Sequence, residues 1–352
     1  MCGISGFCNF DQDYREKKSF WENHLTLMQQ TLAHRGDDGA KPCLFAHAGL
    51  SHAHPVSRDA KGSAQPTMRR QDPDACAVAC NGKIYNADEL IPELTRAGYV
   101  FRTSSDTEVI LYAYLHYGAD FVSRLNGVFA LAIWDEEKET LFLYRDRAGS
   151  KPLFYAVKDG TLLFGSEPKA LFAYPGFSPA ITADSLREIL ALGPARTPGC
   201  GVFKDVSEVL PGHYLTFTRD GIRQHLYWDL TSRPHTDSYA DTVEKVSFLV
   251  RDAIRRQMIS DVPVCSFLSG GIDSSIVTAV AAARLREHGE TLHTFSFDFT
   301  ENEKYFQSNA FQPERDLPYV RLMSEYLHTD HTCLECDPAT LADALSAAVD
   351  AK

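Results

Sequence analysis

The 352-residue sequence contains no uncharged apolar run that approaches the roughly 20 residues a membrane-spanning helix requires. Its first ten residues, MCGISGFCNF, also lack the basic segment followed by an apolar segment that marks a secretory signal. The net charge of −12 is spread along the chain, which argues against wrapping a nucleic acid or an anionic membrane. These absences predict a cytoplasmic protein that acts on small molecules, with no nucleic-acid and no membrane partner.

The nine cysteines are odd in number and irregularly spaced, so the sequence lacks the pattern of a disulfide framework. We therefore expect reduced thiols in a reducing compartment. Cys333 and Cys336 match the CxxC spacing, but no second pair completes a zinc site. Both are predicted to be ordinary thiols.

Strands punctuated by turns dominate the first two thirds of the chain. With 44% hydrophobic residues, a chain of this length can bury a large core and is expected to form two domains. Alternating apolar runs around a polar bend predict hairpins over residues 129–149, 153–167 and 213–230. Apolar residues at helical spacing predict helices over 20–34 and 106–118. Many antiparallel strands with few helices indicate an α+β fold.

The pattern changes near residues 231–238, TSRPHTDS, where polar residues and a proline interrupt the strands. A long amphipathic helix is predicted over 238–258, and we place the boundary here, giving domains 1–232 and 233–352. Strand, loop, helix and strand then follow over 262–268, 269–275, 276–289 and 292–299. This order is one βαβ unit, the start of a parallel sheet.

Cys2 stands directly behind the initiator methionine. Because cysteine is small, we expect the methionine to be trimmed, which leaves Cys2 with a free α-amine. That amine, with an ordinary pKa of about 8, can activate the thiol directly or through a water. The alternative is that Cys2 is merely a small second residue.

The residues around Cys2 favour its interpretation as a catalytic nucleophile. The start CGISGF resembles that of the class II glutamine amidotransferases, the N-terminal-nucleophile family. Further matches follow in the family's order: HRGDDG (34–39), GSAQP (62–66), NGKIYN (81–86), SSDTE (104–108), RLNGVFALAIWD (124–135) and RDRAGSKPLFY (145–155). The resemblance implies an N-terminal-nucleophile αββα sandwich.

The resemblance also implies roles for individual residues. An amide-cleaving nucleophile needs rigid donors for the oxyanion, and the family's donors match the Asn81 side chain and the Gly82 backbone amide. The family's aspartate for the ammonium group of glutamine matches Asp106. Asn-Gly is also a turn signal, and an aspartate ahead of a helix is also a helix N-cap.

The glutamine-binding positions depart from the family pattern in two places. His54 stands where the family has an arginine for the α-carboxylate, and histidine is largely neutral at pH 7. Arg58 could supply that charge if the loop is rearranged. Lys83 occupies a position where many relatives have an acidic residue. The implied glutamine-binding set is therefore His54, Arg58, Lys83 and Asp106.

A second motif, SGGIDSS at 269–275, follows an apolar strand and opens a helix. Backbone amides at such a helix N-terminus form a seat for phosphate, and the Walker A lysine is absent. The motif resembles the SGGxDS loop of ATP pyrophosphatases. The resemblance implies an ATP site with Asp273 as a ligand of Mg²⁺. The implied ATP-binding residues are Leu268, Ser269, Gly270, Gly271, Asp273, Ser274, Ser275 and Phe297.

Together the two motifs resemble the family of glutamine-hydrolysing asparagine synthetases. This resemblance implies that ammonia from glutamine converts aspartate to asparagine with ATP and Mg²⁺, through β-aspartyl-AMP. Members of the family often pair as homodimers, although the sequence itself does not specify an oligomeric state. Two alternatives stay open: a related ligase that acts on another carboxylate, and a catalytically silent binding or regulatory homologue. Because the family's distal synthetase segment is missing, we expect an incomplete α/β parallel-sheet ATP-pyrophosphatase domain in a truncated chain that has at most glutaminase activity.

Overall fold

The computed structural model describes residues 2–36, 41–54, 65–71, 74–193, 195–260, 262–310 and 312–351. The chain divides into two compact units, residues 1–232 and residues 233–352. We call these the first unit and the second unit.

The first unit contains two six-stranded sheets, and every strand pair within them is antiparallel. The first sheet has the order β10-β8-β9-β1-β3-β2. Its strands are β1 (Gly3–Cys8), β2 (Cys43–Leu44), β3 (Ala48–Ala53), β8 (Phe154–Lys158), β9 (Thr161–Gly165) and β10 (Val206–Glu208). Strand β1 lies between β3 and β9, and all six of its residues are buried.

The second sheet has the order β12-β11-β7-β6-β5-β4. Its strands are β4 (Thr67–Gln71), β5 (Asp74–Ile84), β6 (Gly127–Asp135), β7 (Thr140–Arg145), β11 (His213–Thr218) and β12 (Gly221–Leu226). The long strands β5 and β6 pair from Cys76 opposite Asp135 to Ile84 opposite Gly127.

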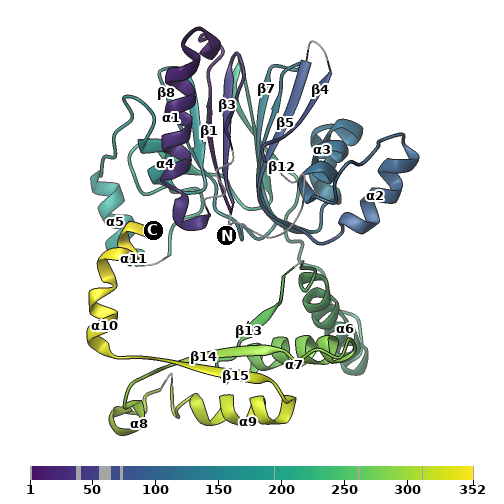
Figure 1. The fold of residues 1–352 in the computed structure, drawn as a ribbon, viewed down its shortest axis with the longest axis vertical. Helices are drawn as coiled ribbons and strands as arrows, with labels where there is room; N and C mark the ends of the chain where they lie inside the picture. Colours follow the sequence, from purple (N-terminus) through teal and green to yellow (C-terminus); the bar gives the residue numbers. More distant parts are fainter. Residues whose placement is uncertain are drawn as a thin grey trace. The chain divides into compact units, whose positions relative to one another are not determined.

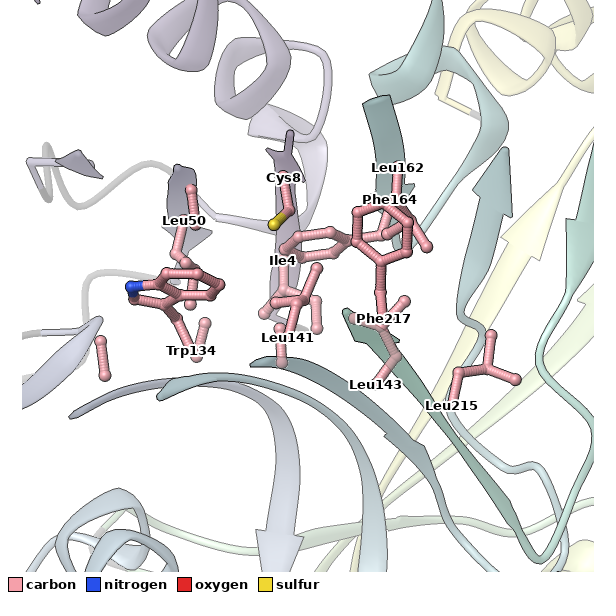
Figure 2. Close-up of a cluster of buried hydrophobic side chains, with 14 of the residues drawn as sticks. Ile4, Cys8, Leu50, Trp134, Leu141, Leu143, Leu162, Phe164, Leu215 and Phe217 are labelled. Carbon is pink, nitrogen blue, oxygen red and sulfur yellow. The ribbon is translucent and has the colours of Figure 1, made fainter. Parts of the chain in front are cut away.

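Apolar side chains from both sheets meet in one cluster (Figure 2). Ile4 and Cys8 of β1 and Trp134 of β6 are at most 1% exposed, and Phe217 of β11 closes the cluster. Because successive side chains of a strand point to opposite faces, each sheet gives one face to this cluster and needs cover on the other.

Helices provide that cover (Figure 1). On the first sheet, α1 (Lys18–Gln30) and α4 (Pro168–Phe172) pack around Phe7. On the second sheet, α2 (Ala87–Arg96) and α3 (Asp106–Tyr117) pack with Val78 and Tyr144. The layers are thus helix, sheet, sheet and helix, and the predicted αββα sandwich is confirmed.

Local predictions agree with these elements. The three predicted hairpins are β6–β7, β8–β9 and β11–β12. The bend between β8 and β9 holds Asp159 and Gly160 at φ of 48° and 74°, the left-handed region that Asp-Gly tolerates. The predicted helix over 20–34 is α1 followed by a 3₁₀ turn, Ala33–Arg35, and 106–118 is α3. Among the described residues of this unit, the remaining helical segments are α5 (Ala183–Leu192) and the 3₁₀ segments Tyr14–Lys17 and Gly118–Arg124.

The second unit contains a parallel sheet of order β13-β14-β15. The strands are β13 (Cys265–Phe267), β14 (His293–Phe299) and β15 (Asp330–Cys336). The helices are α6 (Tyr239–Gln257), α7 (Ile272–Arg286), α8 (Asn302–Tyr305), α9 (Leu317–Leu327), α10 (Pro338–Asp343) and α11 (Leu345–Ala351). Ser238 caps α6, at the start of the predicted helix.

The sequence predicted too few βαβ units in the second unit. The sequence indicated one βαβ unit, but β14, α9 and β15 add a second, which the polar residues of β15 concealed. Cys333 and Cys336 both lie on β15, where positions three apart point to opposite faces. All nine cysteines fall within the described ranges, and none forms a disulfide.

Candidate functional site

Cys2 lies at the head of β1, in the interior of the first sheet. Its side chain is half-buried, and its Sγ lies 3.0 Å from Nδ1 of His54, which follows the end of the neighbouring strand β3. The backbone that follows Cys2 pairs with β3 from Gly3 onward and with β9 from Ser5 onward, which limits the positions open to the thiol. The sequence placed both residues in one site, and the structure brings them into contact.

A buried carboxylate supports the same strand end. Glu167 follows β9, and its Oε1 accepts hydrogen bonds from Arg35 Nε and, at 2.9 Å, from His34 Nε2. Lys169 Nζ lies 3.1 Å from its other oxygen. Burial alone would raise the pKa of Glu167, but the hydrogen bonds from Arg35 and His34 outweigh it, and the pKa lies below its ordinary value. Arg35 also donates to the backbone carbonyl of Cys2 at 3.4 Å, so the network reaches the thiol's own residue.

Asn81 lies on β5 of the second sheet and is 1% exposed. Its Nδ2 donates to Ser166 Oγ at 3.3 Å, and Ser166 Oγ accepts a second hydrogen bond from the Ile4 backbone at 3.0 Å. Ser166 therefore ties the predicted oxyanion donor to the strand that carries Cys2. A side chain held in this way is preorganised, as stabilisation of a developing charge requires.

Gly82 follows Asn81 and pairs with Phe129 of β6. A Cβ at Gly82 would lie 2.1 Å from the Val128 carbonyl oxygen, far inside van der Waals contact. The position therefore requires glycine for packing, independently of any catalytic role. The turn interpretation of Asn-Gly is wrong here, because both residues lie inside a strand.

Asp106 and Lys83 face each other near the end of β5. Asp106 Oδ2 accepts from the Ile84 backbone at 2.9 Å and lies 3.5 Å from Lys83 Nζ. The N-cap of α3 is Ser105, whose hydroxyl accepts from the Glu108 backbone, so the interpretation of Asp106 as the cap is wrong by one residue. Its carboxylate is directed to β5 instead.

Cys80 precedes Asn81 on β5 and is 1% exposed. Burial, followed by the charges of Asp106 and Cys2, raises its pKa well above the ordinary value. Its backbone carbonyl accepts a hydrogen bond from Nε2 of His52, a buried residue of β3. Arg58, the remaining residue of the predicted glutamine-binding set, lies outside the described residues.

Ser166, Glu167 and His52 were not predicted from the sequence. The first two follow directly after the wholly buried strand β9. A hydroxyl and a carboxylate at the end of an apolar strand were the available signal. His52 carried no signal, because only the pairing of β3 with β1 places it near Cys2.

The SGGIDSS motif forms the connection from β13 to α7, as predicted. Gly270 has φ of +83°, and a Cβ there would lie 2.8 Å from the Asp316 carbonyl oxygen. Ser274 Oγ accepts from the Ser269 backbone at 3.2 Å and donates to the Gly271 carbonyl at 3.1 Å, while Ser275 donates to the same carbonyl at 2.7 Å. The exposed Asp273 lies in the first turn of α7.

A cavity of about 460 Å³ opens beside this loop, at the carboxyl ends of β13 and β14. Its lining includes Leu268, Ser269 and Phe297 from the predicted ATP-binding set, together with Asp298 and Asp316. Ligands of parallel sheets bind in this kind of crevice. The other predicted residues lie on the adjoining loop and first turn of α7.

The first unit is an αββα sandwich with a cysteine at the head of an interior strand, the architecture of N-terminal-nucleophile amidotransferases. Residues 1–228 match the sequence model of the glutamine amidotransferase domain, and residues 245–352 match that of asparagine synthase. The chain belongs to the glutamine amidotransferase domain family, as the motifs predicted. None of the helices in the described ranges is both long and apolar enough to cross a membrane.

Similar proteins include asparagine synthetase [glutamine-hydrolyzing] 3 of Bacillus subtilis, which is 42% identical over 99% of this chain and 56% of that protein. Amidase chyE of Penicillium rubens is 31% identical over 99% of this chain and 53% of that protein. A solved structure of glutamine phosphoribosylpyrophosphate amidotransferase from B. subtilis aligns with 96% of this chain and 81% of its own chain. The sequence identity is 16% and the TM-score is 0.47. The chain spans about half the length of the curated relatives that it matches.

Proposed function

We propose that the first unit, residues 1–232, is a glutaminase domain with Cys2 as its nucleophile. The observation that carries the proposal is the position of Cys2 Sγ, 3.0 Å from His54 Nδ1 on a strand that Ser166 links to Asn81. A thiol next to a nitrogen base and near rigid amide donors is equipped for acyl transfer.

In the proposed reaction, Cys2 Sγ attacks the side-chain carbonyl carbon of glutamine. The thiol proton passes to a neighbouring nitrogen, either the α-amine freed by removal of Met1 or His54 Nδ1. The Asn81 side chain and the Gly82 amide stabilise the oxyanion. The C–N bond then breaks, ammonia leaves with the returned proton, and water hydrolyses the glutamyl thioester to glutamate and free Cys2.

Asp106 is proposed to bind the α-ammonium group of glutamine, and His54, Arg58 and Lys83 the other polar groups. The support is that the Asp106 carboxylate lies beside β5. It accepts a hydrogen bond from the backbone of Ile84, which is two residues after Gly82. Lys83 Nζ, at 3.5 Å from Asp106, competes for the same carboxylate. Glutamine binding then has to displace or rearrange this ion pair, in which the Asp106 side chain is only 15% exposed.

We propose that the second unit, residues 233–352, is the N-terminal part of an ATP-pyrophosphatase domain. The SGG turn ahead of the fifteen-residue helix α7 fits a nucleotide phosphate, because the turn at Gly270 requires glycine and the helix N-terminus favours anions. Asp273 would hold Mg²⁺, which would neutralise phosphate charge. Leu268 and Phe297 line the adjoining cavity, where adenosine would bind.

The complete proposed reaction is ATP-dependent amidation of aspartate to asparagine through β-aspartyl-AMP, in the cytoplasm and as a homodimer. The relatives named asparagine synthetase favour it. Two relatives are named amidases and not asparagine synthetases, so the name is not uniform among the relatives. The second candidate is a related ligase acting on another carboxylate. Pyrophosphate release from ATP that depends on aspartate would support the first candidate against the second.

The glutaminase proposal is tested by intact-mass spectrometry before and after treatment with 6-diazo-5-oxo-norleucine, an electrophile that mimics glutamine. We expect loss of Met1 and a single adduct, which Cys2→Ala abolishes. Cys43→Ala, at another half-buried cysteine, is the matched control and should retain the adduct. Retention of Met1 or absence of an adduct at high reagent concentration would overturn the proposal in favour of the silent homologue.

A further inference from the structure

Three side chains able to ligate a transition metal meet at the head of β1. One ligand atom from each of Cys2, His52 and His54 lies within 4.8 Å of the others. Across the described ranges, this is the single group of three or more histidine, cysteine, aspartate or glutamate residues with such spacing. This group was not predicted from the sequence, because the spacing of Cys2, His52 and His54 differs from CxxC, the spacing that usually signals a metal.

The histidines are oriented as ligands are. Residues two apart along an extended chain point to the same side, and the two imidazole rings stack with centroids 5.5 Å apart. The Cys80 carbonyl can only accept, so His52 Nε2 carries the proton in their 3.0 Å hydrogen bond. In the neutral ring, Nδ1 of His52 then carries the lone pair. Metal-binding histidines commonly donate their other N–H to a backbone carbonyl in this way.

The chemistry of the three ligand atoms indicates which metal ion would bind. One sulfur and two imidazole nitrogens suit Zn²⁺, with distances of about 2.3 Å to sulfur and about 2.0–2.1 Å to nitrogen. Tetrahedral geometry then separates sulfur from nitrogen by about 3.6 Å. The 3.0 Å between Cys2 and His54, and the 4.8 Å limit for the whole group, bracket that value. Side-chain shifts of about 1 Å would complete the site.

We propose that Cys2, His52 and His54 bind Zn²⁺, which holds Cys2 as a coordinated thiolate. Binding releases the thiol proton to solvent, and a water or the freed α-amine of Cys2 takes the fourth position. The metal site does not depend on the proposed glutaminase activity. The functional consequence of the metal site does depend on that activity. Because a sulfur bonded to Zn²⁺ cannot attack an amide, we expect Zn²⁺ to inhibit glutamine hydrolysis reversibly.

Titration of the purified chain with Co²⁺ tests the site, because a thiolate ligand gives a near-ultraviolet charge-transfer band and tetrahedral Co²⁺ gives visible bands. The background protein carries Cys333→Ser and Cys336→Ser, so that the CxxC pair cannot contribute. We expect one equivalent of Co²⁺, displaced by Zn²⁺. Because loss of outer-shell partners alone costs 10- to 100-fold in affinity, His54→Ala should cost at least about 100-fold.

Cys2→Ser should remove the charge-transfer band, and His47→Ala, at another half-buried histidine, should bind like the background protein. As a readout independent of cobalt, Zn²⁺ should protect Cys2 from iodoacetamide, and a chelator should restore alkylation. No band at stoichiometric Co²⁺, or an unchanged band in Cys2→Ser, would overturn the site. A 6-diazo-5-oxo-norleucine adduct without the band would refute the metal site alone, whereas the band without the adduct would refute the glutaminase alone.

Discussion

Replacing Glu167 with glutamine removes a negative charge that contacts two cations, Arg35 and Lys169, and the His34 imidazole, and it preserves the shape of the side chain. Glu167 and Arg35 have side chains only 8% and 12% exposed, whereas His34 and Lys169 are 28% and 25% exposed. Removing one partner of a fully buried ion pair costs about 3–5 kcal/mol, and an exposed pair contributes about 0–1 kcal/mol. Because Lys169 and His34 reach solvent, we expect Glu167→Gln to lower the free energy of unfolding by about 2–3 kcal/mol.

The pH dependence identifies the cause of that loss. The folded pKa of Glu167 lies below its ordinary value of 4.5. The stabilisation is therefore complete above that ordinary value and is lost as the pH falls through the folded pKa. Wild type and Glu167→Gln should differ fully at pH 7 and converge in acid.

Urea unfolding followed by tryptophan fluorescence measures the effect on the first unit alone. All three tryptophans, Trp21, Trp134 and Trp228, lie in that unit. Glu93→Gln is the matched control, because Glu93 and its partner Arg124 are 42% and 49% exposed, and we expect a change within about 0.5 kcal/mol. A loss below about 0.5 kcal/mol in Glu167→Gln, or a difference that persists unchanged in acid, would refute the reasoning.

Three further predictions concern the neighbouring residues. Ser166→Ala leaves a buried backbone N–H unpaired and should cost about 2 kcal/mol in the same unfolding assay, whereas no loss would show that Asn81 is positioned without it. Gly82→Ala places a methyl group against a β6 carbonyl and should cost about 3 kcal/mol or more, so a thermal melt at the wild-type temperature would contradict the packing. Lys83→Ala removes a proposed glutamine-binding side chain and should raise KM for glutamine by up to about fivefold, whereas a lowered KM would show that Lys83 only competes for the Asp106 carboxylate.

Some secondary-structure elements were predictable because they depend on residues that are close in the sequence. Asp-Gly bends and alternating apolar runs identified the hairpins, since their geometry depends on neighbouring residues. Strand β15 was missed because its exposed positions carry polar residues. The cap of α3 was misplaced by one position because serine and aspartate cap equally well.

The candidate site was predictable only where a motif carried its residues. Cys2, Asn81 and Asp106 came from quoted blocks of sequence, whereas the contributions of Ser166 and His52 depend on strand pairing. Ser5 lies opposite both Ser51 and Gly165, and no local pattern specifies partners so distant. Long-range register had to come from the structure.

Strand β1 is synthesised long before one of its two partners. One edge can pair with β3 early, but the other stays open until β9 has been made. An apolar strand with an open edge is a template for wrong pairing, and closing so long a loop slows folding. The position of Cys2 is therefore completed late in the assembly of the first unit, and the growing chain has to protect this strand until the region near Gly165 arrives.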